Sequence, residues 1–303
     1  MINLSCRCLD SEIVFNTEAL EKLVYDPEWV LDNQEEFWSS YPAQKYARDW
    51  ARNVNYEIDY EKWRETIRAW SETPPTIRQT QDFLKNTERI IKGKKAFIDK
   101  ALPHVCSYLP AETALDIGFH FTAYIPPRAF ATGELVINMA ATYWNNNPNN
   151  ILNAMVHELF HVGYSYCRDM WETRRDDDLF GILENIQNEG VCTYVAYKAQ
   201  GIFPAPDEKD FQMLDDEKMV KHHMDEVKEI ISAMGSLSGE ELRKQCWDRG
   251  VIGRSFYVVG AQMCRVIDEQ RGKEGLKKTL LEGPVEFFRV YNSLVSDNLK
   301  ILH

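Results

Sequence analysis

Two histidines and a glutamate in the segment His157-Glu158-Leu159-Phe160-His161 have the types and spacing of a catalytic metal site. The histidines are four residues apart, about one helical turn, so both imidazoles project from one face of a helix and can bind one metal ion. Glu158 directly follows the first histidine and can reach a water molecule on that metal. Zinc lowers the pKa of such a water to about 7, so the segment predicts hydrolytic chemistry near neutral pH. The alternative is a buried helix in which the two histidines merely find hydrogen-bond partners.

The residues around this segment predict the helix that the metal site requires. An apolar stripe runs through Leu152, Met155, Val156, Leu159, Phe160 and Val162. Upstream, Asn147-Pro148 has the pattern of an N-cap followed by proline at the first helical position. We therefore expect a helix that starts near residue 148 and is packed into a core.

A catalytic zinc site generally needs a third protein ligand. In the short-spaced arrangement HExxHxxGxxH, this ligand lies six residues after the second histidine, a position that Cys167 occupies here. The glycine of that arrangement is replaced by Tyr164, so the necessary turn is missing. Cys167 is therefore only a secondary candidate, although a thiolate can bind zinc.

Two glutamates of the next predicted helix are the other candidates for the third ligand. The helical neighbours of Glu184 include Asp177, Gln187 and Asn188, which suggests a mixed, more solvated face. Those of Glu189 are apolar, namely Ile182, Ile186 and Ala196. A carboxylate on an apolar face is costly unless a positive group compensates it, and a metal ion does so. We therefore favour Glu189, with a buried salt bridge as the alternative explanation for its position.

The pair of segments His157-Glu158-x-x-His161 and Asn188-Glu189-Gly190 resembles the gluzincin branch of zinc metallopeptidases. More narrowly, it is similar to zinc-dependent peptidase families of unknown function that carry HExxH and then an Asn-Glu-Gly or Glu-Gly motif. The resemblance covers about residues 110–265 and is specific only in these two helices. It implies that His157, His161 and Glu189 bind Zn²⁺ and that Glu158 acts as general base and then as general acid.

The resemblance also implies two further elements of an active site. A strand before the metal helix would align a peptide substrate by β-pairing, and we place it at Val136 to Ala140. A Tyr or His would donate a hydrogen bond to the oxyanion, and we nominate Tyr257. Its helical neighbours are small, namely Gly250, Gly253, Gly260, Ala261 and Cys264. The alternative for Tyr257 is a helix-packing face, and Arg254 is the second candidate for the oxyanion or a substrate carboxylate.

The pattern along the chain predicts an α+β, predominantly helical fold, with a gluzincin-like core and a small β-sheet before the HExxH helix. Residues 10–105 are expected to be mostly helical, including a tryptophan-containing core stripe at Trp63, Ile67 and Trp70 and a long helix over 77–102. Strands are expected at 114–121 and 134–138, followed by the metal helix, a helix that ends near Gln200, and helices on both sides of 235–239. We expect an N-terminal helical region over 1–110 and a catalytic region over 111–303.

Charge and cysteine content limit the partners and the compartment. The net charge of −12 argues against nucleic acid and anionic membranes as partners, because both require clustered Lys and Arg. No signal peptide or transmembrane run is apparent, and seven scattered cysteines suggest reduced thiols, so we expect a cytoplasmic location. Cys6-x-Cys8 is a weak metal motif without a second pair. We expect His120 to be a core or surface residue and His222-His223 to be solvated.

The sequence thus predicts a zinc metallopeptidase that hydrolyses peptide or protein substrates. Two alternatives share the fold: a non-catalytic, zinc-stabilised binding or regulatory protein, and a zinc hydrolase of a non-peptide amide. Glu158 argues against the first alternative, because a purely structural zinc site has no use for that carboxylate.

Overall fold

The computed structural model describes residues 7–72, 85–123, 125, 129–131, 134–140, 147–171 and 177–302. The fold is α+β and predominantly helical, with a small sheet ahead of the HExxH helix, which confirms the predicted fold class. The chain packs into two compact units, one of Met1–Leu9, Pro103–Ala114 and Phe160–His303 and one of Asp10–Leu102 and Leu115–Leu159. The division cuts two continuous α-helices, Lys94–Cys106 and Pro148–Arg168, and the domain boundary expected near residue 110 stays a prediction.

The described helices and strands follow in chain order. The helices of the N-terminal half are α1 (Glu18–Tyr25), α2 (Pro27–Asp32), α3 (Gln34–Ser40), α4 (Pro42–Asn53), α5 (Tyr60–Glu72) and α7 (Lys94–Cys106). The strands are β1 (Ile13–Asn16), β2 (Ile117–Thr122), β3 (Ala129–Ala131) and β4 (Leu135–Asn138). The later helices are α8 (Pro148–Arg168), α9 (Asp178–Lys198), α10 (Lys209–Leu214), α11 (Glu217–Ala233), α12 (Gly239–Gln245), α13 (Ser255–Glu282) and α14 (Pro284–Leu294), with a π-helical segment over Cys246–Ile252. The strands expected at 114–121 and 134–138 and the helices expected after them are thus confirmed.

The four strands form one mixed sheet in the order β1-β2-β4-β3. β1 is parallel to β2, β2 is parallel to β4, and β3 is antiparallel to β4. The described part of residues 10–105 is mostly helical, as expected, but β1 was not predicted. Its run Ile13-Val14-Phe15 is β-prone, but its pairing partner at Ile117 is so far along the chain that the local pattern does not reveal it.

The position of β4 corrects a second expectation. Val136 pairs with His120 of β2 on one side and with Phe130 of β3 on the other. Strand addition requires an unpaired edge. A peptide therefore cannot align by pairing with Val136 or Ile137, which have strand partners on both sides, and pairing at Asn138 to Ala140 stays a prediction.

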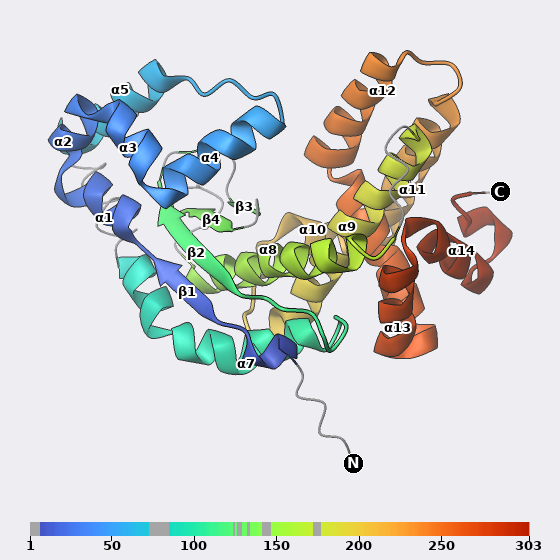
Figure 1. Cartoon of the computed structure of the whole chain (residues 1–303). Helices are drawn as coiled ribbons and strands as arrows, with labels where there is room; N and C mark the ends of the chain where they lie inside the picture. Colours follow the sequence, from blue (N-terminus) through green and yellow to red (C-terminus); the bar gives the residue numbers. More distant parts are fainter. Residues whose placement is uncertain are drawn as a thin grey trace. The chain divides into compact units, whose positions relative to one another are not determined.

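The two faces of the sheet are covered by different helices of its unit. On one face, Phe97 of α7 packs edge-on against Phe119 of β2, with ring centroids 5.7 Å apart. On the opposite face, Tyr46 of α4 lies over the buried His120, with centroids 5.1 Å apart. Figure 1 shows α4 and α7 on opposite sides of β2. His120 is thus a core residue, and its Nε2 lies 3.5 Å from a carboxylate oxygen of Glu134.

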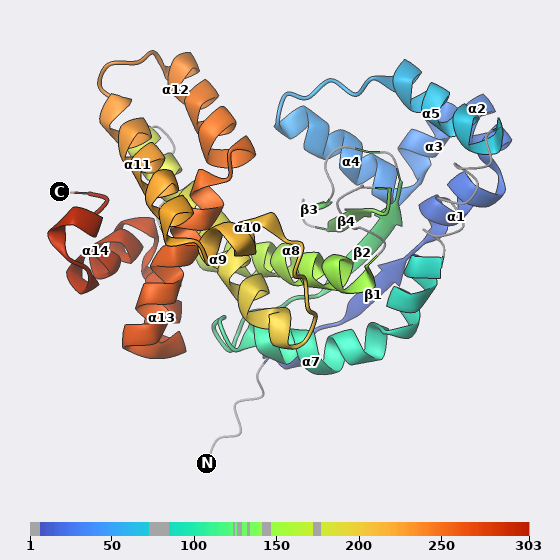
Figure 2. The same ribbon diagram turned by 180° about the vertical axis from the view of Figure 1, so that it is seen from behind.

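In the other unit, α9 lies along α13, which also contacts α10, α11 and α14. Figure 2 shows α9 and α13 side by side. Their backbones touch at two glycines, because a Cβ added to Gly190 would lie 2.2 Å from Cα of Gly260. The lack of a side chain at Gly190 thus permits the close approach of α13.

A disulfide between Cys8 and Cys106 corrects the expectation of reduced cysteines for these two residues, whereas the other four described cysteines form no disulfide. No framework spacing of the cysteines reveals this pair, which is separated by 98 positions. Cys8 is thereby removed from the weak Cys6-x-Cys8 metal motif, and Cys6 lies outside the described residues. Because disulfides persist mainly in oxidising compartments, the cysteine content no longer supports a cytoplasmic location.

The helices of the N-terminal half largely follow the predicted pattern. Trp63 and Ile67 are buried, as predicted for a core stripe, while the side chain of Trp70 lies outside the described residues. A single long helix was expected over 77–102. Residues 77–84 of it lie outside the described residues, and the remainder is helical except for a turn at Gly93, which separates residues 85–92 from α7. Among the described residues, no helix combines the length and apolar character that crossing a membrane requires.

The glycine contact between α9 and α13 generates the first prediction. We expect Gly190→Ala to lower the free energy of unfolding by about 3 kcal/mol, because the new methyl group meets backbone atoms that cannot move aside. Gly181→Ala is the matched control on the same helix, where a Cβ meets nothing within 4 Å. It should raise the free energy of unfolding by about 0.5–1 kcal/mol through helix propensity. Urea unfolding followed by circular dichroism measures both, and equal stability of Gly190→Ala and the parent would contradict the contact.

Candidate metal centre

The HExxH segment lies in the middle of α8, as predicted. The helix begins at Pro148, where Oδ1 of Asn147 accepts a hydrogen bond from the backbone N–H of Asn149 at 3.0 Å. The centre of the apolar stripe of α8 is buried, with Met155, Val156, Leu159 and Phe160 fully excluded from solvent, while Leu152 and Val162 are half-buried. This burial fixes the rotation of the helix, so that His157 and His161, one turn apart, are half-buried on another face.

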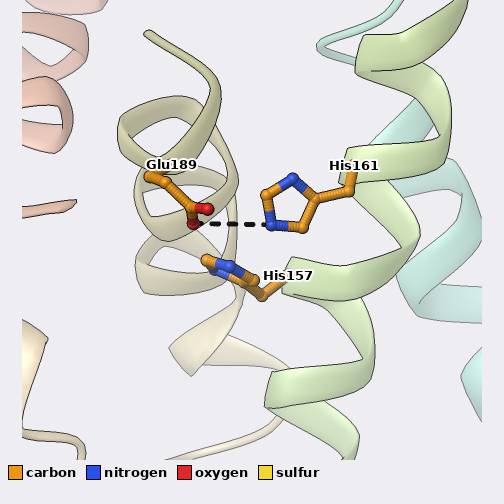
Figure 3. A group of neighbouring side chains, drawn as sticks. All are labelled: His157, His161 and Glu189. Carbon is orange, nitrogen blue, oxygen red and sulfur yellow. Dashed lines mark ion pairs between the residues drawn. The ribbon is translucent and has the colours of Figure 1, made fainter. Parts of the chain in front are cut away.

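Glu189 of α9 joins the two histidines. One ligand atom from each of His157, His161 and Glu189 lies within 4.8 Å of the others. The Nε2 of His161 and Oε2 of Glu189 are 3.5 Å apart. Figure 3 shows the two imidazoles projecting from α8 toward the carboxylate on α9. The structure therefore brings together the three residues that the sequence suggested as metal ligands.

The other candidates for the third ligand are engaged elsewhere. Glu184 forms an ion pair with Arg168, with Nε and Oε1 2.7 Å apart. Cys167 is fully buried, and burial, with the nearby Glu112 carboxylate, raises the pKa of its thiol to about 12. Its protonated thiol is a poor metal ligand at neutral pH, because the thiolate is the form that binds.

Residues of α9 contact the imidazole ring of His161 at Nδ1 as well as at Nε2 and so fix its orientation. Its Nδ1 lies 2.9 Å from Oδ1 of Asn188, which accepts a hydrogen bond from the Nδ1–H. That tautomer leaves the lone pair on Nε2, the atom facing Glu189. Burial alone lowers the pKa of His161, but the Cys192 and Glu189 side chains raise it to well above its ordinary value. The position therefore favours a positive charge, which a metal ion can supply in place of a proton.

The donor set and its dimensions fit zinc. Two imidazole nitrogens and one carboxylate oxygen are a known ligand set of catalytic zinc, which leaves a fourth position for water or substrate. Bonds of 2.0–2.1 Å in a tetrahedral site place neighbouring donors about 3.4 Å apart. The separation of 3.5 Å between His161 and Glu189 agrees with this value.

A second group with metal-ligand atoms, His222, His223 and Glu226 of α11, is explained without a metal. The carboxylate of Glu226 pairs with Arg249 at 3.3 Å and accepts a hydrogen bond from Ser255 at 2.5 Å. A positive charge is thus already present beside it, which disfavours a cation there. His222 is exposed, as expected, but His223 is buried and its Nδ1 is 2.9 Å from the Ser255 hydroxyl, which corrects the expectation that both are solvated.

The remaining predicted site residues lie on α8 and at the start of α13. Glu158 is nearly buried, with 9% of its surface exposed, and follows His157 on α8. Tyr257 is buried on α13, one turn before the Gly260 that touches Gly190, the neighbour of Glu189.

Arg254, the second candidate for contact with the oxyanion, is held in an ion pair with Asp210. Its guanidinium makes a two-point ion pair with Asp210, with distances of 3.0 Å and 2.5 Å, and lies over the ring of Tyr257. Burial lowers the pKa of Arg254, but Asp210, Tyr257 and Glu189 together raise it above its ordinary value. Its backbone has a φ of 69°, a left-handed conformation that is uncommon for any residue but glycine. This ion pair makes Arg254 a weaker candidate than Tyr257 for contact with an oxyanion.

Sequence reasoning missed the contribution of Cys192 to this centre. Its sulfur lies 3.2 Å from Nδ1 of His161. The available signal was its position on the helix, three residues after Glu189, which places it on the same side of α9 as the ligand.

Comparison with known proteins agrees with this centre. Residues 12–298 match the model of the family described as "Putative zinc dependent peptidase (DUF5700)". The match spans nearly the whole chain, so the protein belongs to this family. No curated protein and no solved structure matches the chain.

The ligand geometry predicts which substitutions remove the metal. We expect the parent protein to bind about one zinc ion per chain, and His157→Ala and Glu189→Ala to lose it, because two remaining ligands hold zinc weakly. Glu184→Gln and Cys167→Ser are the controls and should keep zinc, since neither residue joins the group. Elemental analysis after zinc loading and desalting gives the metal content. Full zinc in Glu189→Ala together with loss in Glu184→Gln would transfer the third ligand to Glu184.

Proposed function

We propose that this member of the zinc-dependent peptidase family hydrolyses peptide amide bonds at a zinc centre held by His157, His161 and Glu189. The observation that carries the proposal is the convergence of these three side chains, from two helices, on one position. The family membership over residues 12–298 supports the peptidase assignment. The substrate class that follows is a peptide or an unfolded protein segment.

In this proposal, each residue around the centre has a separate task. His157, His161 and Glu189 would hold the zinc ion, and Asn188 keeps His161 in the required tautomer. Zinc, when bound, supplies a Lewis acid that polarises a carbonyl group and makes water more acidic. Glu158 takes a proton from the attacking water and delivers it to the departing amine nitrogen. Its low exposure supports this role, because a carboxylate with little solvent around it transfers protons to the substrate rather than to bulk water.

We assign Tyr257 as the hydrogen-bond donor to the oxyanion. Its helix, α13, reaches α9 at the contact between Gly260 and Gly190, so the start of α13 lies close to Glu189. Arg254 covers one face of the Tyr257 ring and is itself fixed by Asp210. The ring is thus held in one orientation, which is what a preorganised donor requires.

Replacing the proposed proton-transfer group tests the mechanism. We expect Glu158→Gln to keep zinc but to lower peptide hydrolysis by about 10²–10⁴-fold, because the amide cannot accept a proton. Glu184→Gln removes a carboxylate from α9 without touching the centre and should keep activity. Cleavage of a mixed peptide library, read by mass spectrometry, measures the rates beside the zinc content. Unchanged hydrolysis in Glu158→Gln would refute the mechanism, and a zinc-loaded parent that cleaves nothing would leave the non-catalytic alternative.

Removing one hydroxyl group tests the oxyanion donor. We expect Tyr257→Phe to lower kcat by about 10²-fold with little change in KM, since the lost hydrogen bond forms only in the transition state. Tyr194→Phe is the matched control, because its hydroxyl donates to Asp268 at 2.7 Å in the packing between α9 and α13. That variant should lose stability and retain kcat. Steady-state kinetics on one cleaved peptide gives both constants, and an unchanged kcat in Tyr257→Phe would remove the residue from the mechanism.

A further inference from the structure

Two side chains of α9 contact the rear nitrogen of His161. The Oδ1 of Asn188 lies 2.9 Å from Nδ1, and Sγ of Cys192 lies 3.2 Å from the same atom. Cys192 and Asn188 are also in contact, with Sγ 3.8 Å from Oδ1. The three groups therefore form a closed triangle, on the opposite side of the ring from the Nε2 that faces Glu189.

The positions of the protons in this triangle follow from the ligand role of His161. A neutral imidazole that binds a metal ion through Nε2 carries its proton on Nδ1. That proton needs an acceptor, and Asn188 offers one only when its amide oxygen, and not its NH₂ group, faces the ring. In the flipped amide two donors would oppose each other, so the orientation of Asn188 controls the tautomer of His161.

Cys192 selects the correct orientation of that amide. Its S–H can donate to Oδ1 of Asn188, whose oxygen has two lone pairs and also accepts from His161. With the amide flipped, the thiol would lose Oδ1 as an acceptor. Cys192 is 0% exposed, so solvent water does not replace Oδ1 as an acceptor for its S–H. The thiol thus favours the one amide orientation that keeps the lone pair of His161 on Nε2.

We propose that Cys192 is a positioning residue of the metal centre, which fixes the amide of Asn188 and through it the metal-binding tautomer of His161. The proposal rests on the assignment of His161 as a ligand in the proposed function. It adds a residue that is not itself a ligand and that acts through hydrogen bonds alone.

The test is the zinc affinity of Cys192 variants, measured by competition with a chromogenic chelator. We expect Cys192→Ala to weaken zinc binding about tenfold, as is typical when a partner of a ligating histidine is removed. Cys192→Ser retains a donor of similar size and should bind within threefold of the parent. Cys167→Ala is the control for removal of a buried thiol, since Cys167 is also 0% exposed but lies on α8 outside the triangle. The visible spectrum of the Co²⁺-loaded proteins should change in Cys192→Ala alone.

Cys192 variants made in an Asn188→Asp protein distinguish an effect on the orientation of the Asn188 amide from an effect on side-chain packing. A carboxylate has no donor end, so in Asn188→Asp the acceptor faces His161 in either orientation. In the Asn188→Asp protein, Cys192→Ala should have no effect on zinc affinity. If Cys192 contributed only packing, its loss would weaken zinc binding equally with Asn188 and with Asp at that position. Cys192→Val fills the space without offering a donor, and it replaces the alanine variant should the latter not fold.

The outcomes distinguish this inference from the proposed function. Parent-like zinc affinity in both Cys192→Ala and Cys192→Val overturns the inference, as does an equal loss with Asn188 and with Asp at that position. A tenfold loss that Asn188→Asp abolishes supports it, even when no peptide is cleaved and the proposed hydrolysis fails. A parent protein that binds no zinc overturns both.

Discussion

The metal centre depends on one half-buried carboxylate, Glu189, on a helix face that also carries Ile182, Ile186 and Ala196. With only 20% of its side chain exposed, this group is destabilising unless a positive charge or hydrogen-bond donors compensate it. His161 lies 3.5 Å away, and its raised pKa shows that the position favours a positive charge. A metal ion shared with His157 satisfies the carboxylate and both imidazoles at once. Zinc binding and the stability of the packing between α8 and α9 should therefore be coupled.

The rest of this unit fixes the rotation of α9, so that Glu189 faces α8. The hydroxyl of the buried Tyr164 donates to Oε1 of Gln187 at 3.0 Å. The same Gln187 donates from Nε2 to the backbone carbonyl of Thr279 in α13 at 3.1 Å. The contact of Gly190 with α13, one turn further along α9, excludes any side chain. A helix held by directional bonds and by a backbone contact has little freedom to rotate, and this precision is what a three-ligand site requires.

The sequence revealed those features that depend on residue spacing within one element. The one-turn spacing of His157 and His161 required a helix, and the apolar neighbours of Glu189 distinguished it from Glu184. The features that depend on distant pairing were not predictable. Strand β1 is stabilised by a partner far along the chain, the disulfide joins Cys8 to Cys106, and β4 acquires neighbours on both edges. The role of Cys192 was also hidden, because a cysteine among apolar residues looks like ordinary core until its contact with His161 is seen.

The most direct test of the account is the position of zinc in a crystal of the protein, located by anomalous diffraction at the zinc edge. The account predicts one strong peak bound by His157, His161 and Glu189, with Asn188 behind His161. Such a peak on His222, His223 and Glu226 instead, or a fourth protein ligand that closes the site between α8 and α9, would contradict it. The first result would remove the catalytic centre from HExxH, and the second would leave a structural zinc without a position for substrate.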